Sequence, residues 1–204
     1  MEFAHAADGE KSMSTQPVHY LTPADYLALE RRSEIKHEYY RGEMFAMAGA
    51  TREHGLITLN IGANIHAQLA SRKCEVFTSD MRVKVDETGL YTYPDVVATC
   101  EQACFEDLRG DTLLNPQLVI EVLSDSTENY DRGKKFEHYR RIESLREYVL
   151  ISQEEPHIEH YSRQADGGWL LTEAKGLEAT IELPAIECRL NLAEVYAKVE
   201  FRAI

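Results

Sequence analysis

The sequence predicts a mixed α/β domain built around one central sheet, and three observations support this fold class. Short apolar runs at 96–98 and 118–123 are typical of strands covered on both faces. Helical periodicity marks two longer segments at about 53–71 and 128–142. Alternating segments near the C-terminus, joined by turn residues, indicate an antiparallel meander. These patterns predict a mixed sheet flanked by helices and followed by the meander.

The N-terminal elements begin with a helix whose start is well marked. Thr22 suits the N-cap, Pro23 the first turn and Asp25 the N3 position, and the helix is expected to end near Arg32. The stretch "HEYYRGEMFAM" then predicts a hairpin of two short strands around Arg41-Gly42.

The middle of the chain alternates between helix and strand. The helix from Glu53 to Ser71 has two neighbouring apolar stripes, so it is expected to be broadly buried. "VFTSDMRVKVD" alternates between apolar and polar residues and predicts one strand. "YPDVVATC" and "LVIEVLS" predict two more strands.

The C-terminal part begins with a helix from about Glu128 to Ile142, followed by the strand "EYVLIS". "HIEHYS", "WLLTEA" and "ATIEL" predict the meander, and Asn191 is expected to cap a last short helix. We interpret "HIEHYSR" as an exposed strand rather than a set of metal ligands.

Composition indicates an ordinary soluble chain of one domain, with 204 residues, 44% hydrophobic and 28% charged. We expect a single domain over 13–204. Residues 1–12 precede a second methionine and are expected to be a leader or expression-derived segment without ordered structure. No apolar run approaches the roughly 20 residues of a membrane helix, so no membrane partner is expected.

The four cysteines have no disulfide-framework pattern, which suits a reducing compartment and predicts a cytoplasmic protein. Cys100 and Cys104 have no second Cys/His pair of matching spacing. They are therefore expected to be ordinary buried or loop thiols rather than a zinc site.

The net charge of -13 argues against a protein that binds nucleic acid over its whole surface, because such binding depends on neutralising phosphate charges. It is compatible with a local basic patch, and with a metal-dependent site whose carboxylates add to the negative count.

Two carboxylates stand at unusual positions. Glu121 lies inside the apolar run "LVIEVLS", where an ionised carboxylate is costly unless it has a partner. Asp95 directly precedes the apolar residues 96–98. Neighbouring strands could place both carboxylates on one Mg²⁺ ion, which prefers oxygen ligands. The alternative is that backbone amides or one basic side chain satisfy them.

The two lysines of "GKKF" are expected to face opposite ways. At about 100° per residue, Lys135 lies roughly 40° from the centre of the inward stripe and Lys134 about 140° from it. An inward Lys135 could stabilise charge on a metal-bound phosphate. The alternative is an ordinary i, i+4 helix ion pair with Asp131.

Four segments, in this order and at these spacings, resemble the Uma-two family of endonucleases within the PD-(D/E)XK restriction-endonuclease-like superfamily. They are "EYYRGEMFAMAGATREH", "YPDVV", "PQLVIEVLSDST" and "YDRGKKFEHYRRIESLREYVLI". The resemblance covers about Leu21 to Tyr196 and is most specific from Pro116 to Tyr139. It implies a restriction-endonuclease-like core.

The resemblance also implies roles for particular residues. Asp95 matches the motif aspartate and Glu121 the motif glutamate, which together share a Mg²⁺ (or Mn²⁺) ion, and the backbone carbonyl of Val122 is a further expected ligand. Leu123 stands where the motif has its lysine. In this family the following helix supplies the lysine, and the matching residue is Lys135.

Three more residues match family positions. Glu38 and His54 could bind a second metal or water, or could be structural. Asp131 is interpreted first as a helix-start or lysine-orienting residue, and only then as a ligand.

The function expected from this resemblance is a Mg²⁺-dependent DNA endonuclease. Basic residues that could steer DNA are few, so DNA binding is expected to be weak or partner-assisted; they are Arg82, Lys84, Arg132, Lys134, Arg140 and Arg141. The alternative function is a nuclease-fold module that no longer cuts and acts in binding or regulation as a homodimer. The negative net charge and the displaced lysine favour this alternative.

Overall fold

The computed structural model describes residues 20–201, so the leader predicted at 1–12 lies outside the described residues. The helical elements of the described residues are α1 (Pro23–Glu30), α2 (Arg52–Leu69), α3 (Glu128–Tyr130), the π-helix η1 (Asp131–Lys135), α4 (Phe136–Tyr139) and α5 (Leu192–Val195).

The strands of the described residues form three sheets. A six-stranded sheet has the order β11-β10-β9-β8-β6-β3, with members β3 (Glu75–Thr78), β6 (Val96–Thr99), β8 (Leu118–Val122), β9 (Glu147–Ile151), β10 (His157–Arg163) and β11 (Trp169–Lys175). A five-stranded sheet has the order β2-β1-β5-β4-β7, with members β1 (His37–Tyr40), β2 (Glu43–Ala46), β4 (Arg82–Val85), β5 (Leu90–Thr92) and β7 (Thr112–Leu113). β12 (Thr180–Leu183) and β13 (Cys188–Asn191) pair with each other.

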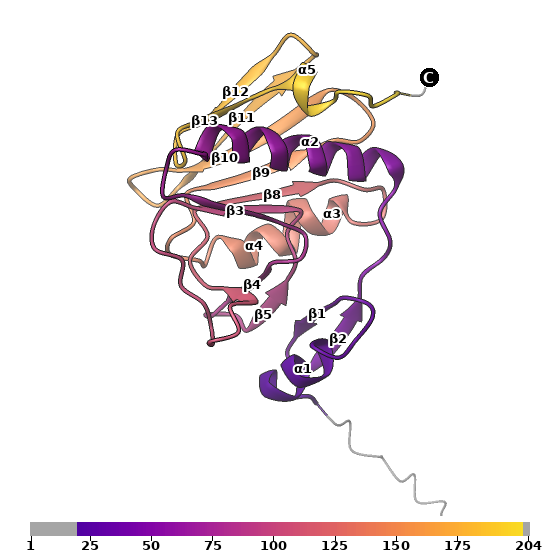
Figure 1. Cartoon of the computed structure of the whole chain (residues 1–204), viewed down its shortest axis with the longest axis vertical. Helices are drawn as coiled ribbons and strands as arrows, with labels where there is room; N and C mark the ends of the chain where they lie inside the picture. The colour runs from indigo at the N-terminus through magenta and orange to yellow at the C-terminus, as the bar shows by residue number, and fades with distance from the viewer. Residues whose placement is uncertain (1–19, 202–204) are drawn as a thin grey trace, which may run out of the picture.

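The six-stranded sheet is mixed, because β8 and β9 are parallel while its other pairs are antiparallel. Helix α2 and the C-terminal elements pack on one face, and α3 and α4 lie on the other (Figure 1). Two hydrophobic clusters result, one on each face of the sheet. The predicted mixed α/β class is therefore confirmed, with a second sheet beside the central one.

Several local predictions are confirmed. Thr22 caps α1 in a reciprocal capping box with Asp25. The hairpin forms around Arg41-Gly42, and the Asn191 side chain accepts a hydrogen bond from the backbone amide of Ala193 at the start of α5. These features depend on neighbours in the sequence, which is why the sequence predicted them.

Helix α2 is buried on one stripe only. Its buried residues include Ile57, Ile61 and Ile65, whereas Leu59 on the other predicted stripe is 65% exposed. The expectation of a broadly buried helix was therefore wrong. Only one face of the helix meets the sheet, and the C-terminal elements do not cover the face that carries Leu59.

The single strand predicted for "VFTSDMRVKVD" is two strands. β3 ends at Thr78, and after a turn β4 begins at Arg82 in the other sheet. The alternation of apolar and polar residues continues through the turn, so it could not reveal the break. The chain changes sheet at this point.

The helix predicted over 128–142 is three consecutive helical segments, α3, η1 and α4, and its regular part ends at Tyr139. The central segment is a π-helix over Asp131–Lys135. A π-helix adds a residue to one turn and is frequent at functional sites. Its presence here is relevant because both of its end residues were predicted for the site.

Strand β10 is not the exposed strand that was predicted. Ile158, Glu159 and His160 are buried, and His160 Nε2 lies 2.9 Å from Glu147 Oε1 on β9. Ile158 packs in the hydrophobic cluster on the α2 face, and the Glu159 carboxylate lies 2.8 Å from Arg132 Nη2 on the other face, which explains the burial. β13, which follows the predicted meander, was not predicted.

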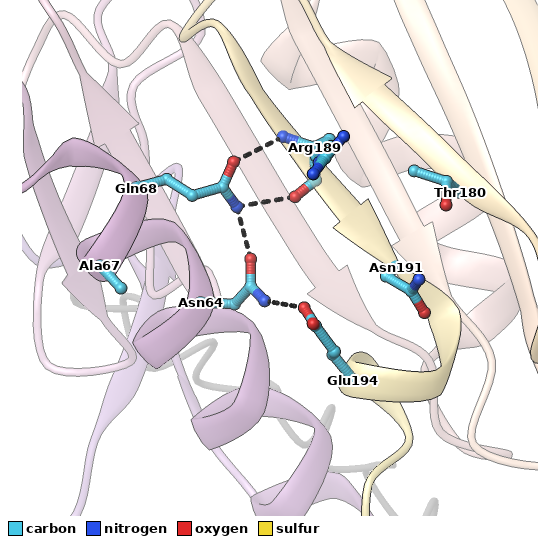
Figure 2. A pocket seen from close by; sticks show the side chains of 7 residues that line it. All are labelled: Asn64, Ala67, Gln68, Thr180, Arg189, Asn191 and Glu194. Atoms are coloured by element: carbon cyan, nitrogen blue, oxygen red, sulfur yellow. Dashed lines mark hydrogen bonds between the residues drawn. The ribbon is translucent and has the colours of Figure 1, made fainter.

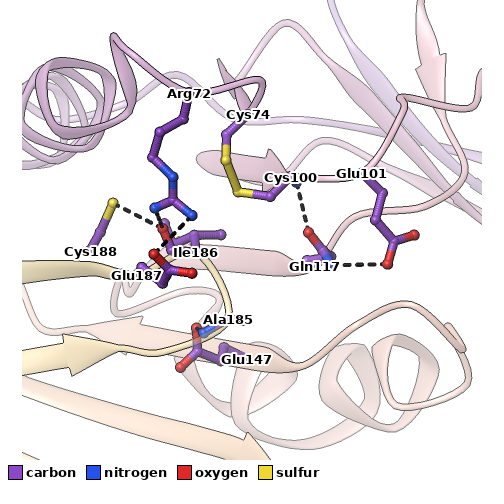
Figure 3. Close-up of a disulfide and its surroundings, with 10 residues drawn as sticks. All are labelled: Arg72, Cys74, Cys100, Glu101, Gln117, Glu147, Ala185, Ile186, Glu187 and Cys188. Carbon is purple, nitrogen blue, oxygen red and sulfur yellow. Dashed lines mark hydrogen bonds and ion pairs between the residues drawn. A yellow bond between two sulfur atoms is a disulfide. The ribbon is translucent and has the colours of Figure 1, made fainter.

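Cys74 and Cys100 form a disulfide (Figure 3). Cys74 precedes β3 and Cys100 follows β6, and the register that pairs Glu75 with Thr99 places the cysteines opposite each other. The prediction of unpaired thiols was wrong for these two, because strand register rather than sequence spacing brings them together. Cys104 and Cys188 are free.

No helix within residues 20–201 is long and apolar enough to cross a membrane.

The disulfide is expected to stabilise the fold. It closes a 26-residue separation, and a cross-link of that length lowers the entropy of the unfolded chain by an amount worth about 3.5 kcal/mol at 25 °C. The double variant Cys74→Ala/Cys100→Ala should therefore unfold at a lower midpoint urea concentration than the oxidised protein. Cys104→Ser, at an exposed free thiol, is the control. Equal midpoints for the double variant and the oxidised protein would contradict the expectation.

Candidate active site on one face of the six-stranded sheet

Asp95 and Glu121 meet on one face of the six-stranded sheet. β6 and β8 are adjacent and antiparallel, and Val96 pairs with Ile120, so Asp95 lies opposite Glu121. Directly opposite residues of an antiparallel pair point to the same face. That face also carries Val119 and Leu123 and is covered by α4. The register thus places both predicted carboxylates toward the same helical layer.

Glu121 faces a lysine and a tyrosine. It is 3% exposed, and its Oε1 lies 2.9 Å from Lys135 Nζ. The hydroxyl of Tyr139, which is fully buried, donates to the same Oε1 at 2.8 Å. Both contacts use Oε1, so neither donor engages Oε2.

The two lysines of "GKKF" face opposite ways, as the helical periodicity predicted. Lys135 is 6% exposed and Lys134 is exposed. The Lys135 ammonium also lies 3.4 Å from Glu38 Oε1 and 3.4 Å from Asp131 Oδ1. The i, i+4 pair with Asp131 therefore exists, but the contact with Glu121 is shorter.

Asp95 is held by two groups from different elements. The backbone N–H of Val122 donates to Asp95 Oδ2 at 2.8 Å, and His54 Nε2 lies 3.2 Å from the same oxygen. His54 is in the first turn of α2, where Thr51 accepts a hydrogen bond from its backbone amide. Asp95 Oδ1 takes part in neither contact, which parallels the arrangement at Glu121.

Glu38 reaches the site from the five-stranded sheet. It is on β1, and the hydroxyl of Thr92 on β5 donates to its Oε1, the atom that also faces Lys135. Lys135 thus joins the two sheets through Glu38 and Glu121. The structure brings together all the residues predicted for the site, from β1, α2, β6, β8 and η1.

The site contains more negative than positive charge, since the carboxylates of Glu38, Glu121 and Asp131 contact Lys135. The carboxylate of Asp95 lies close enough to Glu121 to raise its pKa. Burial raises the pKa of Glu121 to about 8; nearby Lys135 opposes this shift, while Asp131 and Asp95 add to it. Burial likewise raises the pKa of Asp131. The carboxylates hold the pKa of Lys135 well above its ordinary value despite its burial. An added cation would relieve this imbalance.

The donor set fits a small divalent cation held by two carboxylates. Within residues 20–201 no group of three or more His, Cys, Asp or Glu side chains is arranged to hold a metal ion. Mg²⁺ commonly takes only one or two protein carboxylates, with water and phosphate completing its shell. Asp95 and Glu121 each have one oxygen outside the contacts described above, so this pair can serve that role. Glu38 and His54 instead contact Lys135 and Asp95, respectively.

Sequence reasoning missed several members of the site. Tyr139 was not predicted for the site, although its position four residues after Lys135 was a signal that both reach the same partner. Thr92, which contacts Glu38, gave no signal, because the pairing of β1 with β5 is decided by the fold. The Tyr148 hydroxyl donates to the backbone carbonyl of Asp131 at 3.0 Å and supports η1 from β9.

Two basic residues expected to steer DNA are not available for it. Arg82 is buried and donates to Thr112 and to the Tyr93 hydroxyl, the latter at 2.7 Å. Lys84 lies 2.9 Å from carboxylate oxygens of both Asp86 and Glu106. These contacts tie β4 to neighbouring elements, and β4 itself lies between β5 and β7 in the second sheet.

A polar pocket of about 440 Å³ lies elsewhere, between α2, β13 and α5 (Figure 2). Asn64 and Gln68 of α2 face Arg189 and Glu194 across it, and the amide of Asn64 donates to Glu194. Gln68 donates to the Arg189 carbonyl and accepts from the Arg189 amide. None of the predicted site residues lines this pocket, and its polar groups join α2 to the C-terminal elements.

The fold is that of the restriction-endonuclease-like α/β proteins. A crystal structure described as "a putative nuclease belonging to DUF820 from Anabaena variabilis" superposes with a TM-score of 0.70 at 18% identity, covering 87% of this chain and 98% of that one. At that identity the likeness concerns the fold.

The chain belongs to the Uma2 family, whose model is described as "Putative restriction endonuclease" and matches residues 23–193. Two uncharacterised proteins of Synechocystis sp. are also similar. One is 40% identical over 162 residues, covering 79% of this chain and 92% of that protein. The other is 34% identical over 186 residues, covering 91% and 96%. The family and the fold together support a nuclease-like, hydrolytic function.

The raised pKa of Glu121 predicts a pH-dependent stability in the absence of divalent metal. Its pKa is about 8 in the folded protein and near the ordinary 4.5 when unfolded, so the folded state binds more protons between these values. The free energy of unfolding should therefore fall as pH rises from about 4.5 to about 8, by at most about 1.4 kcal/mol per pH unit from this group. Lys135 stays charged throughout this range, because its pKa is raised still higher.

Glu121→Gln removes this titration. Urea unfolding with a chelator at several pH values should show a flatter profile for the variant than for the wild type, and a higher free energy of unfolding near pH 8. The difference between the two proteins isolates Glu121 from other titrating groups. Parallel profiles would contradict the raised pKa.

Proposed function

We propose that this protein is a Mg²⁺-dependent (or Mn²⁺-dependent) DNA endonuclease that hydrolyses phosphodiester bonds. The observation that carries the proposal is the buried Lys135 ammonium 2.9 Å from Glu121 Oε1, on the sheet face that also carries Asp95. An apolar residue in place of Glu121 would suit a purely structural core better, because a buried ion pair is seldom a net gain in stability.

Asp95 and Glu121 would hold the ion through the oxygens that their protein donors leave free, with the Val122 carbonyl as a further ligand. When bound, the ion supplies Lewis-acid activation of the phosphodiester and of the attacking water. His54 and the Val122 amide fix Asp95, and Tyr139 fixes Glu121. These contacts orient both carboxylates before the substrate arrives.

Lys135 is proposed to stabilise the negative charge that develops on the phosphate during hydrolysis. Burial makes this role effective, because a fixed charge in a site that excludes water acts more strongly than one in solvent. Asp131 and Glu38, each 3.4 Å away, position the ammonium. Neither is assigned a direct role in binding the ion.

DNA binding is proposed to be weak or assisted by a partner, and a homodimer is one way to supply more contacts. The net charge of -13 repels the phosphate backbone, and Arg132 is engaged by Glu128 and Glu159. A cytoplasmic location belongs to the same proposal, but it now rests on access to DNA alone, because the Cys74–Cys100 disulfide removes the argument from unpaired cysteines.

The alternative function is a nuclease-fold module that binds or regulates without cutting. Leu123, at the position where the superfamily motif has its lysine, favours this alternative together with the net charge. Incubating plasmid and single-stranded DNA with the protein, in Mg²⁺ or Mn²⁺ against a chelator, separates the two. Metal-dependent cleavage supports the endonuclease, and its absence with all of these substrates supports the module.

Mg²⁺ or Mn²⁺ is expected to raise the melting temperature, because an ion that binds only the folded protein stabilises it. Glu121→Gln should abolish this response and leave the metal-free protein folded. Glu137→Gln, at an exposed glutamate of α4, is the matched control and should respond like the wild type. A normal response in Glu121→Gln would contradict the assignment of Glu121 as a ligand.

The adjacent lysines provide the sharpest test of catalysis. Lys135→Ala should reduce any cleavage rate by about a hundredfold or more, because it removes a charge that stabilises the transition state. Lys134→Ala should weaken DNA binding, mainly at low ionic strength. The measurement is the cleavage rate at saturating and at limiting DNA. Equal losses of cleavage rate in the two variants would mean that Lys135 acts only as one member of a basic surface, which would contradict its catalytic assignment.

A further inference from the structure

A basic and aromatic surface adjoins the site where the β1–β2 turn meets η1 and α4. We call it the Arg41 patch and define it by the residues Tyr40, Arg41, Lys134 and His138. Arg41 and Lys134 are exposed, whereas Tyr40 and His138 are half-buried. The proposed catalytic mechanism uses none of these side chains.

Strand geometry connects the patch to the site. Side chains two apart on a strand share a face, so Tyr40 lies on the same side of β1 as Glu38. Tyr39 between them faces the other way, where its ring stacks on Tyr26 at 4.9 Å. Lys134 directly precedes Lys135, and His138 follows Lys135 by three residues on the same helical stretch. Glu38 and Lys134 both act on the pKa of His138, so the patch lies beside Glu38 and, through it, beside Lys135.

Ring contacts hold the patch together. The Tyr40 and His138 rings are 4.8 Å apart, and the Arg41 guanidinium lies 5.0 Å from the centre of the Tyr40 ring. A guanidinium that stacks on an aromatic ring uses its flat face, so its N–H donors stay available at the edge while the side chain is restricted in orientation. The hairpin turn is thus fixed against α4 with its cation facing solvent.

The patch carries two exposed cations, Arg41 and Lys134, that have no ion-pair partner within residues 20–201. Burial lowers the pKa of His138, and the nearby charges of Arg41 and Lys134 lower it further, although Glu137 and Glu38 oppose this shift. Among residues 20–201, no carboxylate forms an ion pair with Arg41 or Lys134, whereas Arg31, Arg82 and Arg132 all have such partners.

The backbone at Arg41 gives an independent indication of function. Arg41 has φ 49° and Gly42 has φ 92°, so both central residues of the two-residue hairpin turn are left-handed. Such turns favour Asn-Gly, because asparagine tolerates this conformation better than a long side chain does. An arginine in a disfavoured conformation, exposed beside a candidate active site, suggests that its charge is used.

We propose that the Arg41 patch binds the DNA phosphate backbone next to the phosphodiester that is cut, with Arg41 and Lys134 each contacting a phosphate. This inference rests on the proposed endonuclease function, and it adds the path that the substrate strand takes across the protein. DNA held there would extend from the Asp95–Glu121 pair past Lys135 and across the β1–β2 turn. The two cations would offset part of the repulsion from the acidic chain.

The decisive variant is Arg41→Asn, because it removes the positive charge without destabilising the turn. Asparagine suits the left-handed turn, so the melting temperature should rise or stay unchanged. Loss of a phosphate contact should weaken binding by about fivefold at low ionic strength and reduce the slope of log affinity against log salt by about 0.9 for duplex and about 0.7 for single-stranded DNA. Fluorescence anisotropy with labelled 20-mers in a chelator, which prevents metal-dependent cleavage, measures both quantities.

Lys73→Asn is the matched control. Lys73 is exposed beside Cys74, at the far end of the β3–β6 pair from Asp95, and this variant removes the same unit of charge. Its affinity and salt slope should stay close to those of the wild type. Lys134→Gln tests the second cation and should resemble Arg41→Asn in binding.

Weaker DNA binding by Arg41→Asn at a melting temperature equal to or above that of the wild type, with an unaffected Lys73→Asn, supports the proposal. Equal losses of affinity in Arg41→Asn and Lys73→Asn would overturn it in favour of a general charge effect. Wild-type affinity in both Arg41→Asn and Lys134→Gln would also overturn it, while cleavage by the wild type would leave the endonuclease function standing. A wild-type protein that neither binds nor cleaves DNA would overturn both.

Discussion

The buried contact between Lys135 and Glu121 determines how the elements around it must be arranged. A lysine removed from water needs carboxylate partners, and Glu121, Glu38 and Asp131 supply them from β8, β1 and η1. These partners join both sheets to the helical layer between them. Displacing any one of these elements would leave a charge buried without its partner. The charge cluster thus restricts the relative positions of the elements more closely than apolar packing alone would.

The same cluster has more negative than positive charge. This excess disfavours a purely structural role and favours the binding of a cation. Three carboxylates share one lysine, and burial together with repulsion from Asp131 and Asp95 favours protonation of Glu121. Tyr139 and Lys135 engage one oxygen of Glu121, and Val122 and His54 engage one oxygen of Asp95. Each carboxylate is therefore fixed in orientation while keeping an oxygen for another partner. Such preorganisation is what a metal-dependent hydrolase requires.

The surroundings of the site divide into a stabilised and an exposed part. On the α2 side, a disulfide holds β3 to β6, and polar contacts tie α2 to β13 and α5. On the other side, the β1–β2 turn and η1 present the exposed cations Arg41 and Lys134 near Glu38 and Lys135. A substrate strand could approach from that side without displacing a packed element. The π-helix lies where the two parts meet and carries Asp131 and Lys135 at its ends.

The sequence by itself determined the local features of this protein: the caps at Thr22 and Asn191, the Arg41-Gly42 hairpin, the anomalous carboxylate of Glu121 and the inward face of Lys135. Each follows from a few consecutive residues or from one helical period, which act before any tertiary contact forms. Only the tertiary structure decided the break between β3 and β4, the Cys74–Cys100 disulfide, the contact of Thr92 with Glu38 and the burial of Arg82. These features depend on which strands become neighbours, and strand register is a long-range choice that local periodicity does not encode.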